Sequence, residues 1–471
     1  MTKFVPTIGI ECHVQLATKT KLFSGTNNDA REAEPNSVVS PIDYGLPGML
    51  PVLNRGAVDL AIKAGLALGS EIATTSRFDR KHYFYPDLPN GYQITQMYEP
   101  IIGAGKVSVP LAGEKFDVRI HHAHLEADAG KLTHYDDYSL VDLNRVGTPL
   151  IEIVSEPDMH SAEQAKAYVQ ELYLLMSYVG ATHGDLYHGN MRFDVNISLA
   201  PEDASELGMR AEVKNLNSFR AVEKVVEYET KRQTEILEKG SVIEQETRGW
   251  DDAKQKTFSQ RSKENAPDYR YMPDPDLPPI VLTSDEIEKA KSELPQLPSV
   301  YREAWKNMQL DSSVVNTLLS DQSVAKLILE AQKTSDNDAK RIANWFVSSV
   351  DNDEKVEIQI DQQKLLELSN MVESNELSST AAKEIFNILI AGNEKSAREI
   401  AEEKNLLQVS DEGEIIKIVE SVLADPASQK AVTDIKSGND KAIGFLVGQV
   451  MKQSQGKANP ALAQKLIRER L

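Results

Sequence analysis

The segment Ile8-Gly9-Ile10-Glu11-Cys12-His13-Val14-Gln15-Leu16 indicates how the N-terminal part of the chain folds. Its even-numbered positions are apolar, and Glu11, His13 and Gln15 alternate with them. Side chains that alternate in this way lie on opposite faces of a β-strand. The segment therefore predicts a strand with one face in a core and the other face carrying polar groups.

Three further segments, residues 122–128, 192–199 and 212–214, show the same alternation. Their polar sides carry His122, His124, Glu126 and Asp128; Arg192, Asp194, Asn196 and Ser198; and Glu212 and Lys214. Alternation alone is typical of any half-solvated antiparallel sheet. The repeated choice of Glu, Asp and His, where a solvated face favours Thr, Lys and Gln, suggests a site.

A metal site would form if these strands pair side by side. Glu11, His13, Glu126, Asp194 and Glu212 would then converge on an oxygen-rich site with one imidazole. Carboxylate oxygens suit Mg²⁺, which often bridges to substrate phosphates. Lys214 and Arg192 would be placed to contact the phosphates of a nucleotide.

Composition sets limits on the function. The chain has 471 residues, with 52 Lys and Arg against 72 Asp and Glu, and a net charge of −20. This balance argues against a protein that coats nucleic acid through bulk positive charge, although it leaves room for a local basic patch. The single cysteine, Cys12, excludes an internal disulfide and a cysteine-rich zinc site. No signal peptide or long apolar run is evident, so we expect a cytoplasmic protein without a membrane span.

The chain divides near a proline-dense stretch, residues 267–298. Sheet-like segments precede it, and helical patterns follow, with helix starts at Asp425-Pro426 and Asn459-Pro460. We predict an α+β protein: an N-terminal antiparallel-sheet domain over residues 1–293, then an all-helical middle domain over 294–407 and a tail domain over 408–471.

Charge is uneven at the C-terminus. Six basic residues and one acidic residue, Glu469, follow Asp440. A solvated helix face is the usual explanation of such a run, and contact with phosphates is the alternative.

Longer stretches along the chain resemble one known family, the B subunits of the aspartyl/glutamyl-tRNA amidotransferase. The matching stretches occur in the family's order across essentially the whole chain. They are residues 8–16, 44–54, 78–87, 142–156, 212–219, 245–248, 268–273 and 444–451. Because the matches are long and numerous, the resemblance is specific.

The resemblance implies a "cradle" sheet domain and a reaction. Proteins of this family use ATP and Mg²⁺ to phosphorylate the side-chain carboxylate of Glu-tRNA(Gln) or Asp-tRNA(Asn). Ammonia that the amidase, the A subunit, releases from glutamine then displaces the phosphate. The implied assembly is a heterotrimer with this amidase and the small C subunit.

The resemblance also carries site residues. Glu11, His13 and Glu212 match positions implicated in metal binding, and we add Glu126 to them. Asp194 and Lys214 complete the predicted catalytic group. Lys81, Arg192, Asn215 and Asn217 are predicted to bind the nucleotide.

Two departures from the family pattern stand out. The family has two successive acids before Asp128, and the second, which we take to face the metal, is Ala127 here. Some relatives carry a four-cysteine zinc cluster near residues 24–28, and this chain has no cysteine there. We therefore expect no zinc.

In the family the tail domain embraces tRNA. This implies that the basic C-terminal residues contact the RNA backbone. These are Lys452, Lys457, Lys465 and Arg468, together with Arg470.

Two other functions compete with the amidating enzyme. The chain could be a non-catalytic tRNA-binding scaffold for the amidase, which Ala127 makes plausible. From composition alone, it could also be a metal-dependent phosphohydrolase built on the same carboxylates, which would turn over without tRNA or a partner.

Overall fold

The computed structural model describes residues 3–262, 268–349, 360–408, 412–454 and 458–471. The chain forms two compact units, residues 1–298 and 299–471. No helix among the described residues has the length and apolar character needed to cross a membrane.

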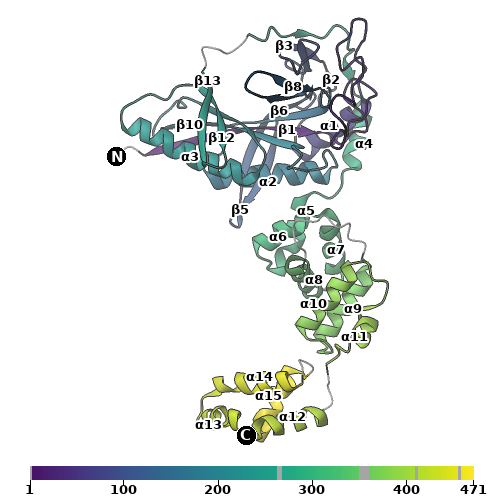
Figure 1. Ribbon diagram of the computed structural model, residues 1–471, viewed down its shortest axis with the longest axis vertical. Coiled ribbons are helices and arrows are strands. Elements are labelled where there is room, and N and C mark those ends of the chain that lie inside the picture. Colours follow the sequence, from purple (N-terminus) through teal and green to yellow (C-terminus); the bar gives the residue numbers. More distant parts are fainter. Residues whose placement is uncertain (1–2, 263–267, 350–359, 409–411, 455–457) are drawn as a thin grey trace. The chain divides into compact units, whose positions relative to one another are not determined.

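An eight-stranded sheet organises the first unit (Figure 1). Its spatial order is β13-β12-β11-β10-β1-β9-β6-β5. The strands are β1 (Phe4–Gln15), β5 (Gly105–Leu111), β6 (Glu114–Ala127), β9 (Pro149–Ser155), β10 (Met191–Pro201), β11 (Ala211–Leu216), β12 (Glu246–Asp251) and β13 (Lys256–Ser262). Strand β1 lies between β10 and β9, antiparallel to both.

The alternation around residues 8–16 is confirmed. Ile8, Ile10, Cys12 and Val14 are almost fully buried, whereas Glu11 and His13 lie on the other face. The core side is covered by helices α1 (Arg55–Ala67), α2 (Ala162–Tyr178) and α3 (Phe219–Glu238). Figure 1 shows α2 and α3 along this face. The hydrophobic effect therefore selects which side chains of β1 face away from the core.

The predicted sheet was wrong in one pairing, because β11 and β12 are parallel. Helix α3 carries the chain from the end of β11 back to the start of β12, and a crossover of this length joins parallel strands. The other pairings of the large sheet are antiparallel. The sheet is mixed, and the α+β class is confirmed.

Short strands and one helix complete the first unit. Strands β3 (Asp79–His82), β4 (Tyr92–Thr95) and β14 (Met272–Pro273) form a three-stranded sheet. Two further pairs are β2 (Thr75–Ser76) with β15 (Ile280–Val281), and β7 (Lys131–His134) with β8 (Ser139–Asp142). Helix α4 (Ser284–Ser292) begins at a Thr283 capping box.

The described part of the second unit is helical. Its α-helices are α5 (Pro298–Ala304), α6 (Ser312–Leu319), α7 (Gln322–Gln332), α8 (Asp336–Ser349), α9 (Gln362–Glu373), α10 (Ser379–Ile390), α11 (Ala397–Glu403), α12 (Glu412–Ala424), α13 (Gln429–Lys436), α14 (Ile443–Gln453) and α15 (Pro460–Arg470). Asp425 and Asn459 cap helical segments whose first residue is proline, as predicted.

Helices α12 to α15 share a hydrophobic cluster that includes Ile415, Val419, Leu446, Val450 and Leu466. The division of the helical part into domains 294–407 and 408–471 stays a prediction. The large-scale boundary lies at Pro298, a few residues beyond the predicted one.

A buried ionic network joins α3 to β12 and β13. Glu229 is fully buried, and its carboxylate accepts hydrogen bonds from Arg232 (2.7 Å), Thr257 (2.6 Å) and Gln233 (3.1 Å). The Arg248 guanidinium lies 3.2 Å from the same carboxylate. Burial opposes the charge on Glu229, but these donors outweigh it and lower its pKa. The network fixes β12 against α3.

Replacing Glu229 with Gln is expected to destabilise the first unit by about 3 kcal/mol, because two arginines lose their buried counter-charge. Native-state hydrogen exchange at the amides of β12 and β13 would measure the loss. Glu238→Gln, at the exposed end of the same helix, is the matched control. Equal protection in both variants would contradict a stabilising role for the network.

Candidate functional site

The strand register brings the polar side chains together in rows across the sheet. One row runs His124, Glu152, His13 and Arg192 through β6, β9, β1 and β10. The next pairs Glu11 with Asp194, and a third runs Gly9, Asn196, Glu212 and Thr247 into β11 and β12. Paired residues share a face. The register alone therefore places these groups on one side of the sheet.

Among the described residues, the predicted metal ligands fall into two groups rather than one. His13 and Glu126 gather with Glu152, whereas Glu11 gathers with Asp194 and Glu212. Within each group, the ligand atoms lie within 4.8 Å of one another. The five residues therefore do not gather as one cluster, because Glu11 turns to the partners on β10 and β11 whereas His13 turns to those on β6 and β9. Their role as metal ligands stays a prediction.

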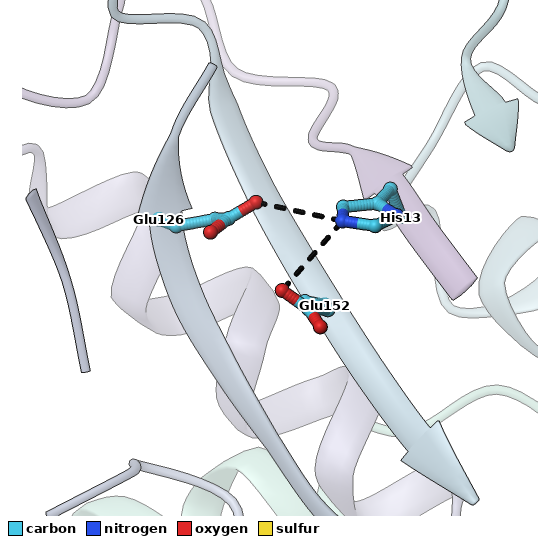
Figure 2. A group of neighbouring side chains, drawn as sticks. All are labelled: His13, Glu126 and Glu152. Carbon is cyan, nitrogen blue, oxygen red and sulfur yellow. Dashed lines mark ion pairs between the residues drawn. The ribbon is translucent and has the colours of Figure 1, made fainter. Parts of the chain in front are cut away.

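The histidine group is held by ion pairs (Figure 2). His13 Nε2 lies 3.7 Å from Glu126 Oε1 and 3.6 Å from Glu152 Oε2. His124 Nε2 lies 3.4 Å from the same Glu152 oxygen. Burial opposes charge on both imidazoles, but hydrogen bonds to the carboxylates and their negative charge raise the pKa of each to about 9. Both histidines are therefore cations near pH 7 in the metal-free protein.

Glu152 was not among the site residues predicted from the sequence. Burial opposes its charge, yet hydrogen bonds with His124 and His13 hold the pKa of Glu152 well below its usual range. A signal was present: Glu152 interrupts the apolar run Leu150, Ile151, Ile153 and Val154. An acid within such a strand needs partners.

The carboxylate group has its own cation. Lys214 Nζ lies 3.0 Å from Asp194 Oδ2 and 2.8 Å from Glu212 Oε1. Burial opposes its charge, but these two carboxylates outweigh it and raise the pKa of Lys214. Burial, followed by the charge of Glu152, raises the pKa of Glu11. The two groups thus interact electrostatically although their ligand atoms are separate.

Neighbouring donors fix these carboxylates. Asn196 Nδ2 donates to Glu11 Oε1 at 3.0 Å, and the Thr247 hydroxyl donates to Glu212 Oε2 at 3.1 Å. The backbone N–H of Asn215 donates to Asp194 Oδ1 at 2.8 Å. Asn215 has φ 62° beside an irregularity between β10 and β11, and asparagine tolerates this conformation better than most residues.

The predicted nucleotide-binding residues do not all lie together. Lys81 lines a cavity of about 170 Å³ with Glu126, Glu152 and His124, and its ammonium lies 4.9 Å from the Tyr269 ring centre. Arg192 on β10 is the register partner of His13 on β1, and its guanidinium donates a hydrogen bond to Asp128 at 3.2 Å. The side chains of Asn215 and Asn217 are exposed, and Asn217 directly precedes Ser218, the N-cap of α3.

Position 127 does not face the histidine group. Ala127 packs against the hydrophobic core, as Leu125 does, whereas Glu126 between them points to His13. A second acid at 127 would follow the same alternation. The expectation that this position faces the metal is therefore wrong for this chain, and Ala127 removes no ligand from the site face.

Among the predicted tRNA-binding residues that the structure describes, Lys452, Lys465 and Arg468 are exposed, and two of these are paired with acids. Arg468 contacts Asp440 at 3.1 Å, Lys465 contacts Glu469 at 3.8 Å, and the less exposed Arg470 contacts Glu420 at 3.4 Å. Lys452 is exposed near the end of α14. Lys457 lies outside the described residues. Local acids thus offset part of the basic run.

The donor sets differ in the cation that they suit. Glu11, Asp194 and Glu212 offer only carboxylate oxygens, the ligands that Mg²⁺ prefers. Within the described part of the chain, the Oδ1 atom of Asn196 beside them is buried without a hydrogen-bond partner, so the environment also has unused acceptor capacity. The group with His13 suits Mg²⁺ less well, because its imidazole must first lose a proton.

Comparisons with known proteins agree with this architecture. Residues 6–288 match the family described as GatB/GatE catalytic domain, and residues 327–471 match the family described as GatB domain. The chain is similar to the B subunit of the aspartyl/glutamyl-tRNA(Asn/Gln) amidotransferase of Persephonella marina, with 45% identity over 100% of both chains. The protein of the same name from Alcanivorax borkumensis is 46% identical over 98% of each chain.

These matches identify the sheet unit as an amidotransferase catalytic domain of the GatB/GatE type. The helical unit carries the GatB domain. The chain belongs to the family of B subunits of the aspartyl/glutamyl-tRNA(Asn/Gln) amidotransferase. The family resemblance and the enzyme class predicted from the sequence are confirmed.

The pKa of His124 leads to a pH prediction for the metal-free protein. Its folded-state value of about 9 lies above the ordinary 6.5. The stabilisation of the folded state by protonated His124 is therefore complete below pH 6.5, and it is lost as the pH rises towards about 9. In EDTA, the wild-type chain should exceed His124→Gln in unfolding midpoint at pH 6 and lose that advantage by pH 10.

His134→Gln is the control, because His134 is exposed on β7 and its imidazole is hydrogen-bonded to nearby Ser139. It should match the wild-type midpoint at every pH. An advantage over His124→Gln that grows with pH would contradict the assigned charge state.

Proposed function

We propose that this chain activates the side-chain carboxylate of Glu-tRNA(Gln), Asp-tRNA(Asn) or both with ATP, and amidates it with ammonia from a partner protein. The observation that carries the proposal is the group Glu11, Asp194 and Glu212, with Lys214 among them, on one face of a family catalytic domain. Relatives that are 41–46% identical bear the name of this tRNA-dependent amidotransferase.

The reaction needs activation, because a carboxylate does not accept ammonia at neutral pH. A carboxylate oxygen of the substrate attacks the γ-phosphorus of ATP, and ADP leaves. The ammonia nitrogen then attacks the carbonyl carbon, the bond to the phosphate oxygen breaks, and a proton is lost as phosphate departs. The protein mostly positions reactants and offsets their charge.

The carboxylates Glu11, Asp194 and Glu212 would hold Mg²⁺, which supplies charge neutralisation at the phosphates when bound. Their fixed orientation supports this role. Lys214 and Arg192 are cations on the same face of the large sheet, and Lys81, on β3, lines the cavity beside Glu126 and Glu152. All three would contact phosphate oxygens. Asn215, on β11, and Asn217, directly before the N-cap of α3, are predicted to contact the nucleotide.

His13 and Glu126 form the other half of the site. Their predicted role as metal ligands remains a proposal, and it requires deprotonation of His13. In the metal-free chain, His13 instead balances Glu126 and Glu152. The cavity lined by Lys81, Glu126 and Glu152 would hold the part of the substrate next to the carboxylates.

The nitrogen must come from another protein, because this sequence has no Ser-rich amidase signature and its single cysteine is buried. We propose a heterotrimer with the amidase A subunit and the small C subunit. The relatives' names designate one lettered subunit of an amidotransferase, which supports an assembly of several different chains.

Glu11→Ala and Glu212→Ala should abolish Gln-tRNA formation in the complex reconstituted with its partners, Glu-tRNA(Gln), ATP, Mg²⁺ and glutamine. Each removes a carboxylate at the proposed phosphoryl-transfer site. Glu202→Ala, an exposed glutamate paired with Lys3, is the control and should retain activity. Full activity of both site variants would contradict the assigned site. If the wild-type complex binds tRNA but forms no γ-glutamyl phosphate from ATP, a scaffold role for this chain would be favoured.

Reversing charge at the C-terminus should weaken tRNA binding. With Lys465→Glu and Arg468→Glu together, we expect lower affinity and a log–log salt slope reduced by about 2, because two cations no longer meet phosphates. Filter binding across a salt series would measure both. Lys239→Glu, exposed at the end of α3, is the control. An unchanged slope would rule out phosphate contacts at these two residues.

A further inference from the structure

Thr247 contacts the carboxylate group from the strand beside it. Its hydroxyl donates to Glu212 Oε2 at 3.1 Å, while Glu212 Oε1 contacts Lys214 at 2.8 Å. Both oxygens of Glu212 are therefore tied to separate partners. A carboxylate held at both oxygens cannot rotate freely, so its remaining lone pairs keep a fixed direction relative to Glu11 and Asp194.

The position of Thr247 is fixed by its neighbours along β12. Glu246 and Arg248 alternate with it, and Arg248 contacts the buried Glu229 of α3. Strand β12 also pairs with Glu212 directly, since Glu212 and Thr247 are register partners in the parallel pairing. The ionic network on one face of β12 thus positions a hydroxyl on the other face.

Glu11 has a matching arrangement. The Asn196 side chain donates to Glu11 Oε1 at 3.0 Å from the same cross-strand row that contains Glu212 and Thr247. Two of the three clustered carboxylates therefore accept a neutral hydrogen bond from this row. A neutral donor orients a carboxylate without cancelling the charge that a cation needs, which distinguishes Thr247 from Lys214.

We propose that Thr247 is a positioning residue that orients Glu212 for divalent-cation binding, acting through Glu212 and not by touching the ion. The inference rests on the proposed function, since it assumes that Glu11, Asp194 and Glu212 hold the cation. Hydrogen-bond partners behind metal ligands commonly contribute tenfold to hundredfold in metal affinity or activity.

The test measures Mn²⁺ binding directly, from the electron paramagnetic resonance signal of free Mn²⁺, in the complex reconstituted with its partner proteins. Thr247→Val keeps the shape of the side chain and removes the hydroxyl, and Thr247→Ser keeps the hydroxyl. We expect at least tenfold weaker binding for Thr247→Val and near wild-type binding for Thr247→Ser. Thr133→Val, on the exposed strand β7, is the matched control.

A second readout separates positioning from a structural defect. Thr247→Val should raise the Mg²⁺ concentration for half-maximal amidation at least tenfold and approach the wild-type kcat at saturating Mg²⁺. A kcat that stays low at saturation, with reduced hydrogen-exchange protection of β12, would assign Thr247 a structural role and overturn the inference.

The failures of the two proposals are distinguishable. If the wild-type complex binds Mn²⁺, Glu11→Ala abolishes binding and Thr247→Val does not weaken it, the positioning role is overturned and the metal site stands. If Glu11→Ala binds Mn²⁺ as the wild type does, the proposed metal site fails, and the inference fails with it.

Discussion

The register of β1 between β9 and β10 is the constraint on which the site depends. Burial of Ile8, Ile10, Cys12 and Val14 fixes which face of the strand meets the helices. A slip of one residue would turn Glu11 and His13 into the core, at the cost of burying charge without partners. The hydrophobic effect on one face therefore specifies the chemistry on the other.

Holding like charges together has an electrostatic cost, and each half of the site offsets it differently. His13 and His124 are cations beside Glu126 and Glu152, and their raised pKa values follow from that contact. In the other half, Lys214 balances Asp194 and Glu212. The metal-free site is thus preorganised by its own cations, and a divalent ion would join a group whose orientation is already set.

The support for the site extends through the sheet to its helix-covered face. Glu229 on α3 holds Arg248 on β12, and the preceding residue of β12, Thr247, contacts Glu212. Stability and geometry are coupled here because successive residues of a strand face opposite sides of the sheet. The parallel crossover from β11 to β12 makes this arrangement possible by placing Thr247 beside Glu212.

The sequence by itself determined the faces of the strands, the α+β class and the family. Period-2 alternation reports burial directly, so Glu11, His13, Asp194 and Glu212 could be placed on the polar side without coordinates. The tertiary structure alone decided which of these groups meet, since that depends on register between strands far apart in the chain. It separated His13 from Glu11, added Glu152 and Thr247, turned Ala127 towards the core and made β12 parallel to β11. The local alternation of apolar and polar residues encodes which face of the sheet a side chain lies on. Which side chains touch each other is set by the pairing of distant strands, and that pairing depends on burial of the core as a whole.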